Sequence, residues 1–347
     1  MNTSITKPPV QENINLSPYN TLRVEAKADQ FITISEPSQL LAIYNKDFFK
    51  KYSPVILGGG SNVLIKSDLK QPVLKISIPG IEIIHERDKE ILIKSGAGVT
   101  WHDFVSFCVE KGFGGIENLA LIPGTVGAAP IQNIGAYGVE LKDTFHSLKA
   151  FLPETGEERV FSINECDFGY RDSIFKKSLK GKVIITEVTL RLQKPPHTIE
   201  DSYYALQEYF QSNGIKSPTI KDVFNAVVEI RESKLPNPEL IGNAGSFFKN
   251  PIVEVSVYQK LKQQYPSIPS FEAGAGKIKI PAGWLIEQAG WKGKKVGNVG
   301  TYKNQALVLV NHGGATGEEI YEHAMKIRES VKEKFGVELD PEVNVIS

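Results

Sequence analysis

The sequence predicts an α+β protein of two to three domains. The chain has 347 residues, and a typical domain has about 150. Its first third consists of short apolar runs separated by glycine-rich turns, whereas its last third alternates strand patterns with amphipathic helix patterns. Hydrophobic residues make up 41% of the chain and charged residues 23%, a balance typical of globular proteins. A disordered, collagen-like or membrane-embedded chain is therefore excluded.

Short apolar runs in the first 95 residues predict strands. The first run ends at three consecutive glycines, and the last two flank a polar turn as in a β-hairpin. A helix should follow between Thr100 and Gly112, because Thr100 and Asp103 form a capping-box pattern at its start. The predicted strands are 54–57, 63–65, 73–78, 81–84 and 91–94.

The segment 112–138 differs from its neighbours. It contains seven glycines and two prolines, carries little charge and shows neither a helical nor a strand period. Long irregular stretches inside compact domains are usually functional, so we interpret this one as backbone shaped around a ligand. Strand patterns resume after it and end before Pro195-Pro196, a predicted boundary. These strands are 148–151, 159–162 and 182–192.

The remainder of the chain is predicted to be helix-rich. The clearest helix is the last, where Thr316 and Glu319 form a capping box and apolar residues recur every three or four positions. An apolar strand at 306–310 precedes it. The predicted helices are 202–211, 219–233 with a Thr219/Asp222 capping box, 256–265, 281–289 and 316–335.

Charge and composition exclude several classes of function. Forty basic and forty acidic residues cancel, so the whole chain has no attraction to nucleic acid or to an anionic membrane. Two cysteines are too few for a disulfide framework or a cysteine-rich zinc site, and the six histidines show no metal-binding spacing. No apolar stretch could span a bilayer, and the polar start at 1–22 resembles a tail rather than a signal peptide. We expect a cytoplasmic protein without a metal.

Two glycine-rich segments are candidates for binding a dinucleotide. Glycines after a strand bring backbone N–H groups close to an anion, so the motif Gly58-Gly59-Gly60-Ser61-Asn62 suits a diphosphate. A tight turn without a ligand explains this motif equally well. In the second segment, 122–138, small residues leave room for a flat ligand, and Gln132 and Asn133 could bond to polar ring edges.

Three residues stand out as candidates for catalysis. Arg171, in the run 169–173, carries the guanidinium fork that suits a substrate carboxylate. Ser246 lies between a flexible turn and two aromatics, and Glu342 lies on a proline-stiffened segment. Each also has an ordinary interpretation: a surface ion-pair residue, a turn hydroxyl and an exposed acid near the C-terminus.

Six motifs, in this order, resemble those of the UDP-N-acetylenolpyruvoylglucosamine reductase (UDP-N-acetylmuramate dehydrogenase) family, flavoproteins of bacterial peptidoglycan precursor synthesis. The resemblance extends from about residue 20 to 345, and the stretch 195–234 resembles the longer subtype, which has a tyrosine loop. The motifs are GGGSN at 58–62, IPGTVGAAPIQNIGAYG at 122–138, GYRDS at 169–173, NAGSFFKNP at 243–251, IPAGWLIEQAGWKG at 280–293 and DPEV at 340–343.

The resemblance implies a fold and a domain organisation. It implies an FAD-binding module of the vanillyl-alcohol-oxidase-like (PCMH) type in two subdomains, followed by a C-terminal α+β substrate domain. The implied segments are a tail at 1–22, the FAD-binding domain at 23–195 divided near 80, the tyrosine loop and linker helices at 196–233, and the substrate domain at 234–347.

The resemblance also implies ligands and residue roles. Non-covalent FAD would take a hydride from NADPH and pass it to the double bond of UDP-N-acetylglucosamine enolpyruvate in a monomeric enzyme. Arg171 and Glu342 would stabilise the developing negative charge, and Ser246 would donate the proton. The implied FAD-binding residues are Gly58, Gly59, Gly60, Ser61, Asn62, Ile122, Pro123, Gly124, Thr125, Gly127, Gln132, Asn133, Ile134 and Gly135; the implied substrate-binding residues are Tyr170, Tyr204, Lys234, Asn250 and Gln288.

An alternative function is that of a flavin-dependent alcohol oxidase of the same superfamily. Such enzymes often tether FAD covalently through a histidine, and neither glycine-rich loop contains one. Tyr203 is adjacent to Tyr204, and the sequence does not decide which of them is the loop tyrosine.

Overall fold

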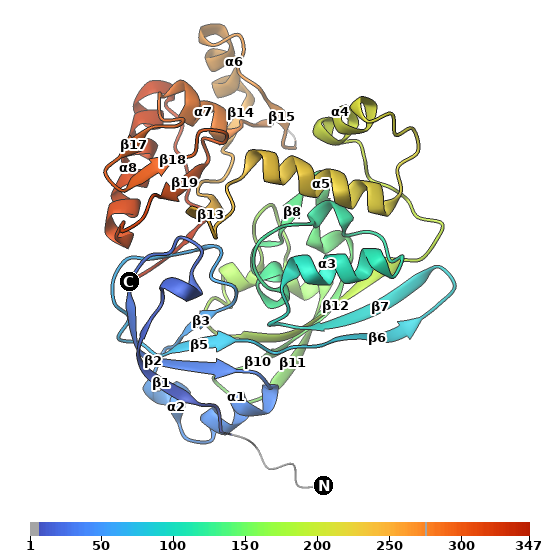
Figure 1. Ribbon diagram of the computed structural model, residues 1–347, viewed down its shortest axis with the longest axis vertical. Helices are drawn as coiled ribbons and strands as arrows, with labels where there is room; N and C mark the ends of the chain where they lie inside the picture. Colours follow the sequence, from blue (N-terminus) through green and yellow to red (C-terminus); the bar gives the residue numbers. More distant parts are fainter. Residues whose placement is uncertain (1–6, 275) are drawn as a thin grey trace. The chain divides into compact units, whose positions relative to one another are not determined.

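The computed structural model describes residues 7–274 and 276–347, which cluster into two compact units. Among these residues, unit 1 comprises 7–14, 28–59 and 69–231, and unit 2 comprises the rest. Figure 1 shows the path of the chain through both units. Within the described part of the chain, no helix is long and apolar enough to cross a membrane.

The first sheet of unit 1 has the strand order β1-β2-β5-β3. Strand β5 pairs in parallel with both β2 and β3, which places Lys75 of β5 opposite Leu57, the last residue of β3. The apolar face of this sheet packs with α1 in a small hydrophobic core. The bounds are β1 Val10–Asn15, β2 Lys27–Ile34, β3 Val55–Leu57, β5 Val73–Ile76, α1 Pro37–Tyr44 and α2 Phe48–Lys51.

The N-terminal segment differs from the prediction of a polar tail at 1–22. Strand β1 occupies Val10–Asn15 and joins the sheet, and Asn20 is buried, with its side chain bonded to Leu16 and Val24. The tail prediction was wrong because a polar edge strand shows little hydrophobic alternation and gains its order from pairing along the sheet edge. Residues 1–6 lie outside the described part of the chain.

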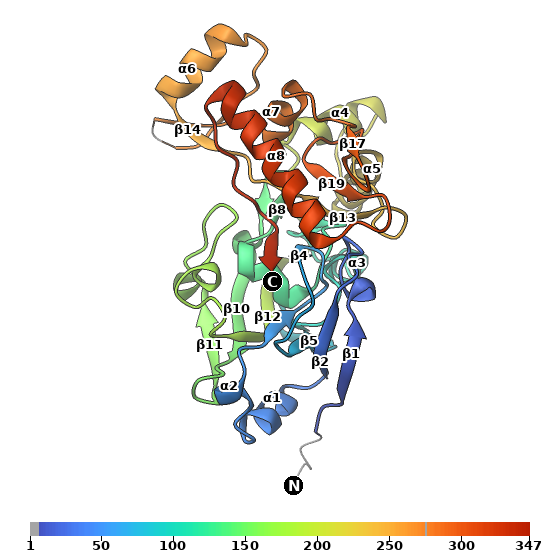
Figure 2. The ribbon, with the colours of Figure 1, turned by 90° about the vertical axis from the view of Figure 1, so that its left-hand side faces the viewer.

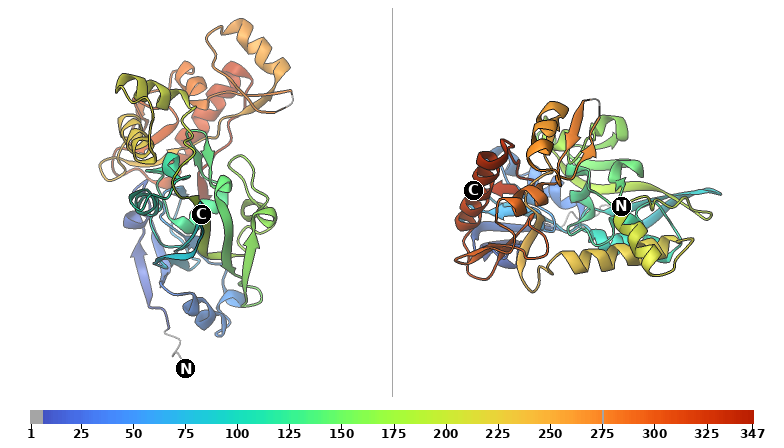
Figure 3. Two further views of the ribbon diagram at one scale, coloured as in Figure 1. Left: turned by 90° about the vertical axis from the view of Figure 1, so that its right-hand side faces the viewer. Right: turned by 90° about the horizontal axis from the view of Figure 1, so that it is seen from above.

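The second sheet of unit 1 is antiparallel, in the order β11-β10-β12-β7-β6. The predicted hairpin is confirmed as β6–β7, which extends from the sheet in Figures 1 and 3. Helix α3 lies where the sequence predicts a helix, although the Thr100 side chain makes no capping bond. The bounds are β6 Ile81–Glu86, β7 Glu90–Gly96, α3 Trp101–Glu110, β8 Gly135–Ala136, β9 Val139–Glu140, β10 Phe145–Phe151, β11 Glu158–Ser162 and β12 Ile184–Gln193.

Two further helices complete unit 1, and both confirm predictions. They are α4 (Tyr204–Ser212) and α5 (Ile220–Lys234), the latter reaching three residues into unit 2. The predicted capping box of α5 is present, because Thr219 and Asp222 exchange side-chain and backbone hydrogen bonds. Their apolar faces belong to the main hydrophobic core of unit 1, together with residues of the antiparallel sheet and α3.

Unit 2 contains a four-stranded antiparallel sheet in the order β13-β19-β18-β17, a three-stranded sheet β14-β16-β15 and the parallel pair β4-β20. Helix α8 contributes much of its core, and Figure 2 shows the length of this helix. The bounds are β4 Val63–Ile65, β13 Gly242–Ser246, β14 Ile252–Glu254, α6 Val255–Gln264, β15 Phe271–Glu272, β16 Lys277–Lys279, α7 Ala282–Gln288, β17 Lys295–Val296, β18 Val299–Thr301, β19 Val308–Asn311, α8 Gly317–Phe335 and β20 Asn344–Ile346.

Helix α8 buries a histidine in the core of unit 2. The His323 side chain is 3% exposed, its Nε2 atom has no hydrogen-bond partner among the described residues, and its ring meets Trp291 edge-on. Burial lowers the pKa of His323 to about 4, assisted by the charges of Lys326 and Lys294. The folded unit therefore holds this imidazole neutral.

This burial predicts a loss of stability in mild acid. His323 titrates at about 4 when folded and near 6.5 when unfolded, so its contribution is complete above pH 6.5 and is lost as pH falls from 6.5 towards 4. Between pH 7 and pH 5 this histidine should cost about 2 kcal/mol of the free energy of unfolding. Urea unfolding followed by tryptophan fluorescence should show a weaker pH dependence of the free energy of unfolding for His323→Gln than for the parent. Equal pH dependence in the His323 variant and the parent would contradict the assignment.

Candidate active site

The two glycine-rich segments meet within unit 1. A Cβ atom added to Gly58 would lie 2.8 Å from Thr125 Oγ1, and one added to Gly59 would lie 2.9 Å from Gly124 Cα. These positions thus need glycine, because a side chain would force the two main chains apart. Because the two segments are in contact, they could both bind the same ligand, as the sequence predicts.

The second segment also packs against the turn that joins β7 to α3. The backbone of Val126 bonds to Val99 and that of Gly127 to Ala97. A Cβ atom on Gly127 would lie 2.5 Å from the Cβ atom of Ala97. The predicted FAD-binding residues from 122 to 135 all lie on this one segment; among them Ile134 is buried, Ile122 and Gln132 are half-buried, and Pro123 is exposed.

Asn133 has several hydrogen-bond partners within unit 1. This side chain is 0% exposed, and its amide donates to Glu140 Oε2 and to the Gly169 carbonyl, both at 3.0 Å. Its carbonyl oxygen accepts from the backbone of Lys142. Both of its N–H groups are therefore used within unit 1, where Asn133 ties the glycine-rich segment to the turn that carries Arg171. Its role in binding FAD stays a prediction.

The first glycine-rich motif is shared between the units. Gly58 and Gly59 belong to unit 1, whereas Gly60, Ser61 and Asn62 belong to unit 2. Gly60 has a φ angle of +65°, and a Cβ atom there would lie 1.9 Å from the Tyr19 carbonyl oxygen, so no other residue fits. Within unit 2, the Asn62 side chain donates to the backbone carbonyl of Glu342 at 3.3 Å.

Arg171 lies at the tip of a tight turn of unit 1. Gly169 and Asp172 exchange backbone hydrogen bonds, and this closure holds Arg171 at a φ angle of +53°. The guanidinium donates to the Gly135 carbonyl at 2.6 Å. The predicted substrate residue Tyr170 lies beside it, with its ring 5.8 Å from the guanidinium carbon. A non-glycine residue with positive φ is strained and marks a functional candidate.

A second arginine, which the sequence analysis missed, lies near Arg171. Arg231 of α5 hydrogen-bonds to Tyr137, and its Nε atom has no partner among the described residues. Burial lowers the pKa of Arg231, and the charge of Arg171 acts in the same direction. Arg231 comes one helical turn after Val227, on the side of α5 that is otherwise apolar. A charged residue at such a position is unusual, and this feature of the sequence could have identified Arg231 as a candidate.

Tyr203 and Tyr204 differ in their surroundings. The ring of Tyr203 meets that of Tyr137 edge-on, with centroids 5.3 Å apart, whereas Tyr204 is 77% exposed. The Asn118 side chain ties this region together, since it donates to the backbone carbonyls of both Tyr137 and Glu200. The geometry favours Tyr203, rather than the predicted Tyr204, as the tyrosine that faces the glycine-rich segment.

In unit 2 the structure brings Ser246 and Glu342 together, although they are far apart in sequence. The register of β13 shifts between Asn243 and Ser246, and exposed Ser246 ends the strand. The next residue, Phe247, accepts a backbone hydrogen bond from Glu342 at 2.8 Å. Two predicted catalytic residues therefore lie on adjacent stretches of backbone.

The other predicted substrate residues also lie in unit 2. The Asn250 side chain accepts from the backbone of Ala282 at 2.9 Å and so satisfies the first N–H group of α7. Gln288 ends α7 with an exposed side chain, and Lys234 is exposed at the end of α5. Asn250 thus has a structural role at the start of α7.

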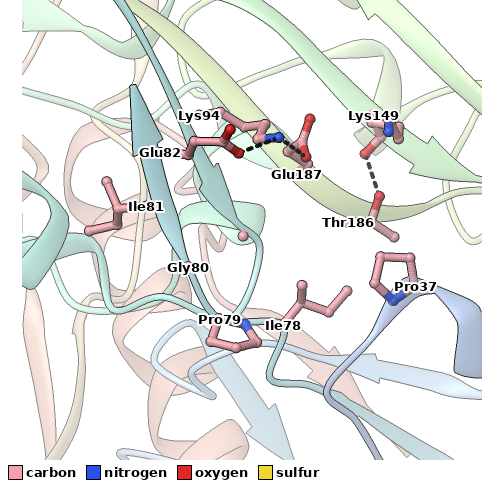
Figure 4. A pocket seen from close by; sticks show the side chains of 11 residues that line it. Pro37, Ile78, Pro79, Gly80, Ile81, Glu82, Lys94, Lys149, Thr186 and Glu187 are labelled. Carbon is pink, nitrogen blue, oxygen red and sulfur yellow. Dashed lines mark hydrogen bonds and ion pairs between the residues drawn. The ribbon is translucent and has the colours of Figure 1, made fainter. Parts of the chain in front are cut away.

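A separate pocket in unit 1 contains none of the predicted site residues. Figure 4 shows its charged lining: Lys94 lies 2.8 Å from Glu82 and 3.5 Å from Glu187, and Thr186 bonds to the backbone of Lys149. Two lysines, Lys94 and Lys149, and two glutamates line the pocket, so it offers no net formal charge to a ligand. Among the described residues, no cluster of three His, Cys, Asp or Glu residues could hold a metal.

The closely packed glycine loops fit a flavin dinucleotide, which needs main chain within reach of its phosphates. This fit predicts that Gly59→Ala weakens FAD binding about tenfold or more, because the added methyl meets rigid Gly124 backbone. Release of FAD from diluted holoenzyme, followed by flavin fluorescence, measures the affinity. Gly181→Ala is the control, since it adds a methyl at a φ angle of +73° with no atom within 4 Å. Unchanged FAD affinity in Gly59→Ala would contradict the fit.

Comparisons with known proteins agree with this site. Residues 29–162 match the family model of an FAD binding domain, and residues 237–346 match that of the UDP-N-acetylenolpyruvoylglucosamine reductase C-terminal domain. Proteins named UDP-N-acetylenolpyruvoylglucosamine reductase from Flavobacterium johnsoniae and Amoebophilus asiaticus are each 48% identical to this chain over 337 residues, which cover 97% of this chain and 99% of each relative.

A crystal structure supports the fold. The UDP-N-acetylenolpyruvylglucosamine reductase of Thermus caldophilus aligns over 98% of this chain and 100% of its own, with a TM-score of 0.68 and 23% identity. The predicted α+β fold, with an FAD-binding module followed by a C-terminal domain, is confirmed. On this sequence identity over nearly its full length, the chain belongs to the UDP-N-acetylenolpyruvoylglucosamine reductase family.

Proposed function

We propose that this chain reduces UDP-N-acetylglucosamine enolpyruvate to UDP-N-acetylmuramate, with NADPH as reductant and non-covalent FAD as hydride carrier, in peptidoglycan precursor synthesis. Full-length identity to proteins of that name supports the activity. The structural observation that carries the proposal is the pairing of the Ser246 and Glu342 segments, because the reaction needs a proton donor and an acid on one surface.

The chain's own residues divide the chemistry of the reduction. Bound FAD supplies hydride transfer from NADPH to the substrate's double bond. Arg171 binds the substrate carboxylate and, with Glu342, stabilises the negative charge that develops there. Ser246 delivers a proton to the carbon next to the carboxylate. Arg231 adds a second cation near Arg171, which favours an oxyanion at this place.

The remaining assignments belong to the same proposal. Tyr203, Tyr170, Lys234 and Gln288 contact the sugar nucleotide or NADPH. FAD is held by residues 58–62 and by Ile122, Pro123, Gly124, Thr125, Gly127, Gln132, Asn133, Ile134 and Gly135 of the second segment. We propose that the FAD-binding domain spans 23–195 and the substrate domain 234–347. The enzyme is a cytoplasmic monomer whose product supports cell-wall growth, cell shape and division. The two free, buried cysteines are consistent with a reducing compartment.

Anaerobic stopped-flow spectroscopy tests this function. NADPH should bleach the flavin, and subsequent addition of UDP-N-acetylglucosamine enolpyruvate should restore its absorbance with formation of UDP-N-acetylmuramate. Flavin that NADPH reduces but the sugar nucleotide does not reoxidise would exclude the proposed substrate. Protein that binds no FAD would exclude the function altogether.

A further inference from the structure

Lys75 places a cation beneath the first glycine-rich loop. It lies on β5, which runs parallel to its neighbours β2 and β3, and it is opposite Leu57. The loop begins at the next residue, and the Lys75 ammonium donates to the carbonyl of Gly58 at 2.5 Å. The strand pattern at 73–78 does not reveal this contact, because it does not show which backbone the Lys75 side chain meets.

The charge of Lys75 has no counter-ion within the described part of the chain. Its ammonium forms no ion pair there, and burial is the cause that lowers the pKa of its amine. Lys70, eight residues after Asn62, shows the usual alternative: it is exposed and pairs with Asp29 at 3.3 Å. Removing a cation from water costs free energy, and a neutral carbonyl offsets only part of that cost. A bound anion would offset more of it.

The position of Lys75 indicates which anion this is. Gly58 and Gly59 press against Thr125 and Gly124, so the ammonium lies where the two glycine-rich segments meet. The carbonyl oxygen of Gly58 carries partial negative charge, which would repel a phosphate. The hydrogen bond from the Lys75 ammonium reduces this repulsion. The negatively charged diphosphate of a dinucleotide would supply the counter-charge for the Lys75 ammonium.

We propose that Lys75 is a positioning residue for FAD: it fixes the Gly58 carbonyl and supplies positive charge to the loop that binds the FAD diphosphate. This inference rests on the proposed role of the two segments in holding FAD. It assigns cofactor affinity, rather than the chemical step, to Lys75.

Variants at position 75 test this assignment. Lys75→Met should weaken FAD binding about tenfold at low salt, and the difference from the parent should shrink at high salt, because salt screens a charge interaction. Lys75→Arg should keep most of the affinity. Lys70→Met removes the same charge from the same unit and should bind FAD as the parent does. The measurement is FAD release from diluted holoenzyme at both salt concentrations.

The outcomes separate this inference from the proposed function. Parent protein that binds no FAD would exclude the function, whereas parent and Lys75→Met with equal affinities would exclude only the role of Lys75. A loss that is the same at low and high salt, or that Lys75→Arg does not repair, would assign Lys75 to packing instead. Circular dichroism checks folding, and if Lys75→Met does not fold, Lys75→Gln decides by the same criteria.

Discussion

Ser246→Ala is expected to leave reduction of the flavin by NADPH near the parent rate and to slow its reoxidation by the enolpyruvyl sugar nucleotide about 10²- to 10⁴-fold, the usual contribution of a positioned general acid. Alanine removes the proton that the proposed reaction delivers to carbon. It should leave the backbone unchanged, because Phe247, not Ser246, makes the adjoining bonds to Leu307 and Glu342.

Separate half-reactions measure this difference. Anaerobic stopped-flow gives the rate of flavin bleaching with NADPH and the rate of recovery with the sugar nucleotide. Ser256→Ala, on the exposed side of α6 in the same unit, is the matched control and should change neither rate. If both half-reactions of Ser246→Ala fell equally, the serine would support the site rather than donate a proton.

Local sequence patterns predicted much of the fold because each depended on neighbours in the chain. The last helix was predicted from its capping box and its apolar period, and Thr316 and Glu319 exchange the expected bonds. Strand β1 and helix α1 were missed. Strand β1 is polar and largely exposed at a sheet edge, and α1 has few buried residues, so neither shows a strong periodic pattern.

The candidate site was predictable only as segments. Glycine-rich motifs identified the two loops, but their contact depends on tertiary packing between Gly59 and Gly124. For the same reason, sequence spacing could not show that the Ser246 and Glu342 segments pair. Lys75 and Arg231 were missed because each lies within an otherwise ordinary strand or helix pattern, and their importance depends on the neighbours they meet.

Arg171 offers the other large effect. Arg171→Lys keeps a cation and the left-handed backbone but loses the planar fork that binds a carboxylate through two bonds. We expect reoxidation by the sugar nucleotide to slow about 10²- to 10³-fold, as when one donor to a developing oxyanion is removed. Flavin reduction by NADPH should change little. Arg191→Lys, an exposed arginine of β12, is the control and should behave as the parent.

Backbone strain at position 171 provides an independent test of whether this arginine is kept for function. At a φ angle of +53°, arginine costs about 1–3 kcal/mol that glycine would not. Arg171→Gly relieves this strain but loses the bond to Gly135 and adds flexibility to the unfolded chain. These effects nearly cancel, so the melting temperature should stay within about 2 °C of the parent while reoxidation is lost. A structural arginine would give the opposite result, a clear fall in melting temperature with activity retained in the folded fraction, because the turn from Gly169 to Asp172 would then depend on its side chain.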